Sequence, residues 1–220
     1  MALILNIDTA LQTASVCLSK DGVPLAFEES TTQNQHASWL HTSIKNILVS
    51  NGTDFHDIDA IAVSNGPGSY TGLRIGLSTA KGICYASNIP LICISTLTIM
   101  ASSVAGEVTD IICPMIDARR MEVFTALYDK ELNIVTKPFA LKLQQESFHE
   151  VLSDHKILFT GDGAIKFEDM ITDTNAIFVQ RKISALNMLP LAEEMYANAR
   201  YADLAYSEPE YVKAVYTTSY

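Results

Sequence analysis

The chain has 220 residues, of which 48% are hydrophobic and 18% charged, and its formal net charge is −10. This composition excludes a disordered or fibrous chain and indicates a globular protein large enough to bury its own core. The longest apolar runs, such as residues 89–94, are far shorter than the roughly 20 residues of a membrane-spanning helix, and the first lysine is Lys20, so we expect neither a membrane segment nor a secretory leader.

The cysteines and histidines indicate no metal site and no disulfide framework. Each cysteine lies within an apolar segment and has no closely spaced partner: Cys17, Cys84, Cys93 and Cys113. We therefore expect buried thiols in a reducing compartment, that is, a cytoplasmic protein. His36 and His41 are five residues apart and do not share a helical face, so they do not predict a paired metal site.

The first half of the chain predicts strands, then helices, in an α/β order. Residues 2–7, 15–19 and 23–28 read as strands, with an Asp21-Gly22 hairpin turn between the last two. A helical period begins at Gln35 and ends at Asn51-Gly52. There follow a strand at 60–63, a glycine-rich turn, a helix to about residue 87, a strand at 90–94 and a helix over 96–105.

After Gly106 the pattern restarts and predicts a second α/β unit. Strands are expected at 111–116, 123–128, 156–160 and 176–179, and helical stretches at 144–152 and from Ser184. Pro190 marks either the first turn of that last helix or a kink within it. The economical architecture is two α/β lobes, residues 1–105 and 106–220, without a flexible linker.

The densest motif is Asn65-Gly66-Pro67-Gly68-Ser69, between a strand and a helix. Glycines on both sides of Pro67 permit unusual backbone angles, and Ser69 is a natural N-cap. Such a turn either holds an anion at the helix N-terminus or is a purely structural tight turn. The spacing matches neither the P-loop nor the dinucleotide fingerprint, so both interpretations stay open.

Within the following helix, Gly72, Gly76 and Ala80 recur every four residues and share one face. Glycine inside a helix costs roughly 1 kcal/mol, so this face needs a compensating contact. Close approach of a neighbour supplies one, either inside the same lobe or across a subunit boundary.

These segments together resemble the TsaB (YeaZ) family, within the TsaB/TsaD group of the actin-like ATPase superfold. The resemblance rests on segments that recur in order over most of the chain, and it is loose after about residue 173: Leu3–Thr9, Gln35-His36, Gly66–Gly76, Ala80–Ile83, Asn88–Leu91, Asp117–Val123 and Gly161–Gly163. It implies an α/β fold of two actin-like (ASKHA) lobes, each a mixed sheet with helices.

The resemblance also implies which kind of member this is. Catalytic members carry a His-Met-Glu-Gly-His segment whose histidines bind a metal, and those positions here are Thr96 and Met100. Neither is a good ligand for the ions of such a site. The chain therefore resembles the non-catalytic partner subunit, a scaffold and activator in making threonylcarbamoyladenosine in tRNA.

Several expectations about partners and ligands follow from the resemblance. The partners would be a TsaD-like catalytic homologue and a TsaE-like accessory ATPase, with homodimers formed alone and tRNA bound only through the complex. The contact would involve Gly72, Gly76, Ala80 and Ile83. No intrinsic cofactor is expected, although ATP or ADP at a subunit interface is compatible with the fold; the alternative function is an actin-like ATP-binding protein or weak ATPase.

Three further groups each have a structural and a ligand-binding interpretation. Asp8 at the end of the first strand is either a turn carboxylate or part of a nucleotide site with Gly66, Gly68 and Ser69. Gly161-Asp162-Gly163 is either a second nucleotide loop or a strand-to-helix turn. The charged cluster Asp117, Arg119, Arg120 and Glu122 either binds an anionic ligand or partner loop or forms an internal ion-pair network.

The charge balance yields a first testable prediction. The chain has 15 Lys and Arg against 25 Asp and Glu, and its basic residues are dispersed. Because neutralisation of phosphates drives nucleic-acid binding, the isolated chain should show negligible tRNA affinity at physiological salt. A gel-shift assay checks this, and a sub-micromolar complex at that salt would contradict it.

Overall fold

In the computed structural model the chain forms two compact units, and the structure describes residues 2–31, 36–107 and 110–213. The first unit comprises residues 1–99 and 183–210, and the second comprises residues 100–182 and 211–220. Gln35, where the first helix was expected to start, lies outside the described residues. No helix in the described part of the chain is both long and apolar enough to cross a lipid bilayer.

The first unit is built on a five-stranded mixed sheet with the strand order β3-β2-β1-β4-β5. Its elements are β1 (Leu3–Asp8), β2 (Ala14–Lys20), β3 (Val23–Ser30), α1 (His36–Ser50), β4 (Ala60–Gly66), α2 (Tyr70–Ser87), β5 (Leu91–Ser95), α3 (Thr96–Ser102), η3 (Ala185–Met188) and α6 (Leu189–Ala197). The β1–β2–β3 part is antiparallel, whereas β1, β4 and β5 are parallel. The boundary between the units falls within α3.

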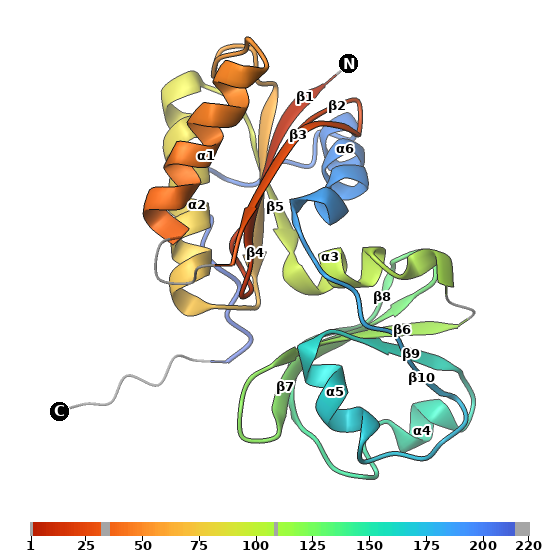
Figure 1. Cartoon of the computed structure of the whole chain (residues 1–220). Coiled ribbons are helices and arrows are strands. Elements are labelled where there is room, and N and C mark those ends of the chain that lie inside the picture. The colour runs from red at the N-terminus through yellow and green to blue at the C-terminus, as the bar shows by residue number, and fades with distance from the viewer. Residues whose placement is uncertain (1, 32–35, 108–109, 214–220) are drawn as a thin grey trace, which may run out of the picture. The chain divides into compact units, whose positions relative to one another are not determined.

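The sequence pattern of the central strands follows from burial on both sides. In Figure 1, α1 and α2 lie on one face of this sheet and α6 on the other. β1 is consequently buried along almost its whole length, which explains why apolar residues predominate in it, with Asn6 as a buried polar exception. α1 and α2 place Leu40, Ile44, Leu77 and Cys84 in the core beneath them.

The second unit repeats the plan with the strand order β10-β9-β6-β7-β8. Its elements are η2 (Ala105–Glu107), β6 (Ile111–Asp117), β7 (Glu122–Asp129), β8 (Ile134–Lys142), α4 (His149–Leu152), β9 (Ile157–Thr160), α5 (Asp162–Glu168) and β10 (Ala176–Phe178). An aromatic cluster of Phe148, Phe159, Phe167 and Phe178, with ring centroids 5.2–6.3 Å apart, lies in its core.

The predicted lobe boundary needs a correction, because residues 183–210 belong to the first unit. The backbone N–H of Ala185 donates to the Ser15 hydroxyl of β2 at 2.9 Å, and Ala202 pairs with Leu91 of β5. Leu204 packs on the core of the first unit. The sequence identified an apolar helical face in this region, but an apolar face does not specify which of two cores it covers.

Two other elements, α4 and β8, differ from the sequence expectation. The helical stretch expected at 144–152 is confined to α4, His149–Leu152. β8 was not predicted; it is an edge strand, half-exposed, with Pro138 in its middle, which is a position that edge strands tolerate. Pro190 stands in the first turn of α6, so of the two interpretations the helix start is confirmed.

Candidate functional site

Several polar groups of the glycine turn between β4 and α2 are hydrogen-bonded within the chain. Ser69 caps α2 by accepting a hydrogen bond from the Gly72 N–H at 3.3 Å. Its own N–H donates to the Ala10 carbonyl at 2.7 Å. Two N–H groups at this helix end therefore already have acceptors. One acceptor is the Ser69 hydroxyl, and the other is the backbone carbonyl of Ala10 in the β1–β2 connection.

Both glycines of this turn are required by close backbone contacts. A Cβ on Gly68 would collide with the Ala10 carbonyl oxygen, and one on Gly66 would lie 2.5 Å from the Glu210 carbonyl oxygen. Gly66 also has a φ of 123°, which side chains rarely adopt. Because carbonyl oxygens repel anions, these contacts support the structural interpretation of Gly66, Gly68 and Ser69 over phosphate binding.

The Gly72, Gly76 and Ala80 face of α2 is buried against its own unit, which corrects the interface prediction for these residues. A Cβ on Gly72 would collide with the Thr9 carbonyl oxygen, and one on Gly76 with the Thr9 hydroxyl oxygen. The Thr9 hydroxyl donates to the Gly72 carbonyl at 2.7 Å. The compensating contact that the glycines need is thus internal.

Ile83, the fourth residue predicted for the interface, is partly buried and packs against the same core. The glycine of α2 that has no internal contact is Gly82, which is exposed; a Cβ on it would have no described atom within 4 Å. Sequence reasoning missed Gly82, although it lies within the same helix pattern. Its position in the helical repeat could have identified it, because a residue six positions after Gly76 lies on a different face of the helix.

Asp8 is fully buried at the end of β1. Its Oδ1 accepts hydrogen bonds from the Ser64 hydroxyl at 2.6 Å and from the Ala10 N–H at 3.1 Å. Its Oδ2 has no hydrogen-bond partner among the described residues. Burial raises the pKa of the Asp8 carboxyl, against the opposing effect of these hydrogen bonds. A turn carboxylate that accepts hydrogen bonds from nearby groups accounts for the bonds that Asp8 makes.

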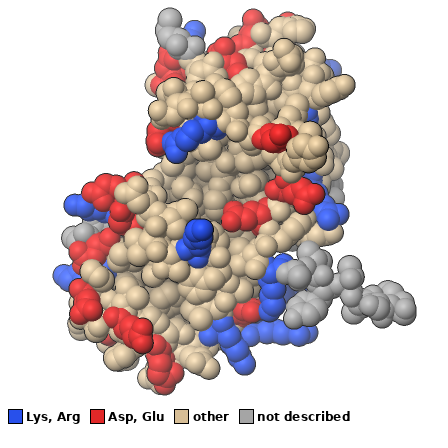
Figure 2. Space-filling model, turned by 180° about the vertical axis from the view of Figure 1, so that it is seen from behind, with Lys and Arg blue, Asp and Glu red and all other residues tan. Residues whose placement is uncertain are grey.

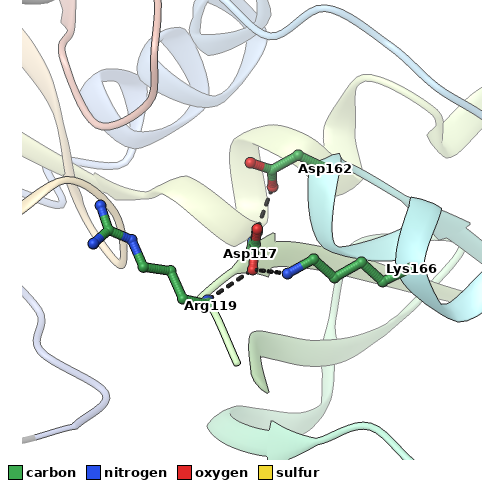
Figure 3. Close-up of polar contacts among 4 residues, drawn as sticks. All are labelled: Asp117, Arg119, Asp162 and Lys166. Atoms are coloured by element: carbon green, nitrogen blue, oxygen red, sulfur yellow. Dashed lines mark hydrogen bonds and ion pairs between the residues drawn. The ribbon is translucent and has the colours of Figure 1, made fainter. Parts of the chain in front are cut away.

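The charged cluster is divided into paired and unpaired members. Asp117 accepts hydrogen bonds from Lys166 Nζ at 2.6 Å and from the Arg119 N–H at 2.7 Å, and its own N–H donates to Asp162 at 2.9 Å (Figure 3). Partial burial raises the pKa of Asp117, but the bond from Lys166 and the one from the Arg119 N–H outweigh it and lower the pKa. Glu122 pairs with Lys213 at 2.8 Å.

The two arginines of this cluster are exposed, and neither guanidinium forms an ion pair within the described part of the chain. Figure 3 shows the Arg119 side chain extending away from Asp117. Arg119, Arg120 and Met121 have φ values of 69°, 49° and 60°, a left-handed run that is strained for residues other than glycine. The internal network therefore explains Asp117 and Glu122, and contact with an anionic ligand or partner loop remains a prediction for the arginines.

Gly161-Asp162-Gly163 is accounted for as a strand-to-helix turn. Gly161 has a φ of 98°, and a Cβ there would collide with Met100 and the Met115 carbonyl. A Cβ on Gly163 would lie 2.8 Å from Val123. Packing within the second unit thus explains both glycines, and Asp162 begins the short helix α5.

Thr96 and Met100, which the sequence comparison aligned with two histidines of the catalytic pattern, are buried. Thr96 and Met100 lie in α3 at 0% and 1% exposure, and the Thr96 hydroxyl has no hydrogen-bond partner among the described residues. No cluster of three or more His, Cys, Asp or Glu in the described ranges is arranged to hold a metal ion. Burial raises the pKa of Cys17 to about 11 and that of Cys113 to about 12, so these thiols stay protonated.

Comparison with known proteins identifies the class to which this arrangement belongs. The model of the family described as TsaD, tRNA N6-adenosine threonylcarbamoyltransferase, matches residues 29–219. Two crystal structures from Pseudomonas aeruginosa share the fold: a protein with similarity to peptidase YeaZ (24% identity, 97% of this chain and 100% of that one, TM-score 0.84) and YeaZ (23%, 96% and 100%, TM-score 0.79). The protein is therefore an actin-like α/β protein of the threonylcarbamoyltransferase group.

Within that group, one relative decides the branch. The tRNA threonylcarbamoyladenosine biosynthesis protein TsaB of Escherichia coli is 31% identical over 96% of this chain and 94% of its own length. The chain belongs to the TsaB family. The resemblance inferred from the motifs, and the actin-like fold that it implied, are confirmed.

The internal role of the glycine face predicts the effect of Gly76→Leu. A leucine would have to displace the Thr9 hydroxyl, which donates a hydrogen bond to the Gly72 carbonyl. Overpacking of this kind costs about 1–3 kcal/mol. The variant should unfold at lower urea concentration than the parent, whereas Gly82→Leu, at an open helical position, should not. Equal stability of Gly76→Leu and parent would contradict the internal packing.

The raised pKa of Asp8 predicts how stability depends on pH. In the folded state the pKa of Asp8 lies above its ordinary value of 3.8. The protonated carboxyl therefore contributes stability that is fully present below pH 3.8 and is lost as the pH rises through the raised pKa. Asp8→Asn removes the titration, and its unfolding free energy relative to the parent should therefore rise with pH above 3.8. Urea titrations across a pH series measure this difference.

Asp129 offers a matched control of opposite sign. A hydrogen bond from the Asn133 side chain lowers its pKa, so its contribution to stability is lost as the pH falls. Asp129→Asn should become less stable relative to the parent as the pH rises.

A pH-independent difference in unfolding free energy between Asp8→Asn and the parent would contradict the Asp8 prediction, because it would show that this carboxyl has the same pKa in the folded and unfolded states.

Proposed function

We propose that the chain is a non-catalytic scaffold and activator subunit of the enzyme that installs threonylcarbamoyl on the tRNA adenosine next to the anticodon. It acts by forming a heteromer with a catalytic homologue. Family membership supports the pathway, since the relative from E. coli is named for threonylcarbamoyladenosine biosynthesis. The observation that carries the subunit role is the outer face of α2, which is open at Gly82.

The non-catalytic role is supported by the residues in α3. In the catalytic pattern two histidines a helical turn apart bind a metal, and here Thr96 and Met100 occupy those positions. Both side chains are buried, and a methionine thioether does not suit a hard or borderline ion. A chain that matches the transferase model over residues 29–219 and lacks these ligands fits a partner derived from the catalytic fold.

The outer face of α2 has the properties of a helix contact site. Gly82 lies in the interior of an eighteen-residue helix, where glycine costs roughly 1 kcal/mol, and nothing described in the chain occupies the space beside it. Ser78 lies about one helical turn before Gly82 and Arg74 about two turns before it, and all three residues are exposed. A backbone without a Cβ lets a second helix approach closely. Such a contact would offset the helix-propensity cost of Gly82, which no contact among the described residues offsets.

The charge of the two outer helices favours a different chain as partner. α1 and α2 contain Lys45, Arg74 and Lys81 and no Asp or Glu, although the whole chain has a net charge of −10. The charged side chains that these two helices contribute are all positive, which suits a partner that brings carboxylates to them. A homodimer of the isolated chain, in which like charges meet, would then be the weaker assembly.

The remaining parts of the proposal concern tRNA, the accessory ATPase and nucleotide. On the face drawn in Figure 2, Lys and Arg side chains stand singly or in small groups among Asp and Glu, so tRNA would be held through the complex. A TsaE-like ATPase would join the same cytoplasmic assembly. Arg119 and Arg120 of the second unit are exposed and form no ion pair with the residues that the structure describes, which suits contact with an anionic ligand or partner loop.

The alternative function is nucleotide binding or weak ATP hydrolysis by the chain itself. The exposed arginines and the buried carboxyl of Asp8 are the features that favour it. The carbonyl oxygens that face Gly66 and Gly68 disfavour phosphate at the glycine turn. Calorimetric titration with ATP separates the cases: the scaffold proposal expects heat from nucleotide only when the catalytic homologue is present.

The proposal predicts that Gly82→Leu separates assembly from folding. Leucine is a better helix former than glycine, so the variant should be as stable as the parent or more stable by about 1 kcal/mol. The side chain would obstruct the helix contact by about 1–3 kcal/mol, which weakens binding of the catalytic homologue by roughly 5- to 150-fold. Circular dichroism melts and calorimetric titration of the two proteins measure both effects.

Gly82→Ala is the graded control. It supplies the same gain in helix propensity with a far smaller side chain, so it should be stabilised while losing less affinity than Gly82→Leu. Parent-like affinity in Gly82→Leu would place the partner elsewhere. A parent chain that forms no complex with its catalytic homologue would end the scaffold proposal itself.

A further inference from the structure

After α6 the chain returns along the edge of the first sheet as an irregular segment, Ala202–Glu210, which we call the strap. Figure 1 shows this part of the chain (blue) passing from α6 to the side of the sheet where α2 lies. The Ala202 N–H donates to the Leu91 carbonyl of β5 at 2.8 Å, and the Glu210 N–H donates to the Asn65 carbonyl at 2.7 Å. The strap is therefore fixed at both ends.

Asp203 shapes the strap between these ends. Its Oδ1 accepts hydrogen bonds from the N–H groups of Ala205 at 2.8 Å and Tyr206 at 3.0 Å, and its carbonyl accepts one from the Ser207 N–H at 2.9 Å. This is a compact turn stabilised by a side-chain carboxylate. It places Tyr206 at the outside of the strap.

Lys81 ties the middle of the strap to α2. Its Nζ donates to the Ala205 carbonyl at 3.2 Å and to the Ser207 carbonyl at 2.9 Å. Tyr206 lies between these two residues in the chain. Lys81 is the neighbour of Gly82 in sequence, and Tyr85 follows Lys81 by one helical turn.

The first glycine of the glycine turn is shaped to receive the strap. Any Cβ on Gly66 would lie 2.5 Å from the Glu210 carbonyl oxygen. A residue that the sequence suggested for phosphate binding is thus required by a backbone contact with the end of the strap. The turn and the strap fit each other, and the turn leads directly into α2.

Two tyrosines project from this assembly into solvent. Tyr85 is 83% exposed and Tyr206 is 84% exposed, so neither contributes its ring to the core of the unit. Tyrosine is among the residues that contribute most to protein interfaces when a partner buries it. Here Tyr85 comes from the helix, one turn after Lys81, and Tyr206 comes from the strap, between the two residues whose carbonyls Lys81 holds.

We propose that the strap is the second half of the partner-binding surface, where it presents Tyr206 to the chain that docks on α2. Lys81 is the positioning residue that holds the strap. The inference rests on the proposed scaffold function and names the catalytic homologue as the occupant. α1 and α2 bring lysine and arginine but no carboxylate to this surface, whereas the strap brings the exposed Asp203 and Glu208. A second copy that packed α2 on α2 at Gly82 would set the positive helices against each other, and a different chain can meet them with acidic residues.

The experiment is a double-mutant cycle with Lys81→Met and Tyr206→Ser, read out as affinity for the catalytic homologue. Burial of a tyrosine at an interface hot spot corresponds to roughly a thirtyfold loss of affinity on truncation. Tyr206→Ser should show a loss of this size. Lys81→Met should show a similar loss, and the double variant should be no weaker than the weaker single variant, because both changes remove the same contact.

Hydrogen exchange gives a readout that a direct contact of Lys81 with the partner would not change. In free Lys81→Met protein the Glu210 amide should exchange faster than in the parent, whereas in Tyr206→Ser it should not. Tyr201→Ser is the matched control: Tyr201 immediately precedes the strap, packs on Tyr196 of α6, and should be replaceable without loss of affinity.

Each outcome bears on the proposal. Parent-like affinity in Tyr206→Ser, together with weak binding by Gly82→Leu, would overturn the role of the strap and leave the scaffold function in place. Multiplying losses in the double variant would overturn Lys81 as a positioning residue. If the variants change self-association and leave the heteromer unaffected, the occupant is a second copy and the inference is wrong. A parent without any heteromer ends both proposals.

Discussion

The contact between Thr9 and the glycine face of α2 determines the arrangement of the first unit. The Thr9 hydroxyl donates to the Gly72 carbonyl, and the Thr9 carbonyl lies against Gly72 with no side chain between strand end and helix. Because Gly76 continues the same face and lies against Thr9 and against Val63 of β4, α2 lies close to the end of β1 and to β4 over more than one turn. The packing of Gly72 and Gly76 against Thr9 fixes the rotation of α2 about its own axis. As a result, Arg74, Gly82 and Tyr85 lie on the exposed face of the helix.

The order of strands and helices was readable from the sequence because most elements are long and strongly patterned. The antiparallel β1–β2–β3 start, α1, β4 and α2 appear where the apolar period predicts them. β8 was missed because it is a half-exposed edge strand that contains Pro138, and neither alternation nor β propensity marks it. The return of residues 183–210 to the first unit was missed because amphipathic periodicity gives the buried face of a helix and says nothing of which sheet buries it.

The candidate site shows the same limit at the level of single residues. A glycine in a sequence indicates that a Cβ is either not tolerated or not needed at that position. It does not indicate which atoms lie beside the position. Thr9 lies beside Gly76, a backbone carbonyl lies beside Gly66, and nothing described lies beside Gly82. The spacing that the sequence showed most clearly, Gly72 to Gly76, belongs to internal packing, and the isolated Gly82 belongs to the outer surface. Only the position of the neighbouring chain distinguishes these cases.

The discontinuity of the first unit has a consequence for how the protein is made. Synthesis proceeds from the N-terminus at about 5–20 residues per second, so the whole of residues 100–182 is translated, over roughly ten seconds, between the two parts of the first unit. During that interval β1 and β5 lack η3, α6 and the strap, and an apolar sheet face is open to water. The core of the second unit lies within residues 111–178, so all of its residues are synthesised before the N-terminal unit receives the last part of its own core.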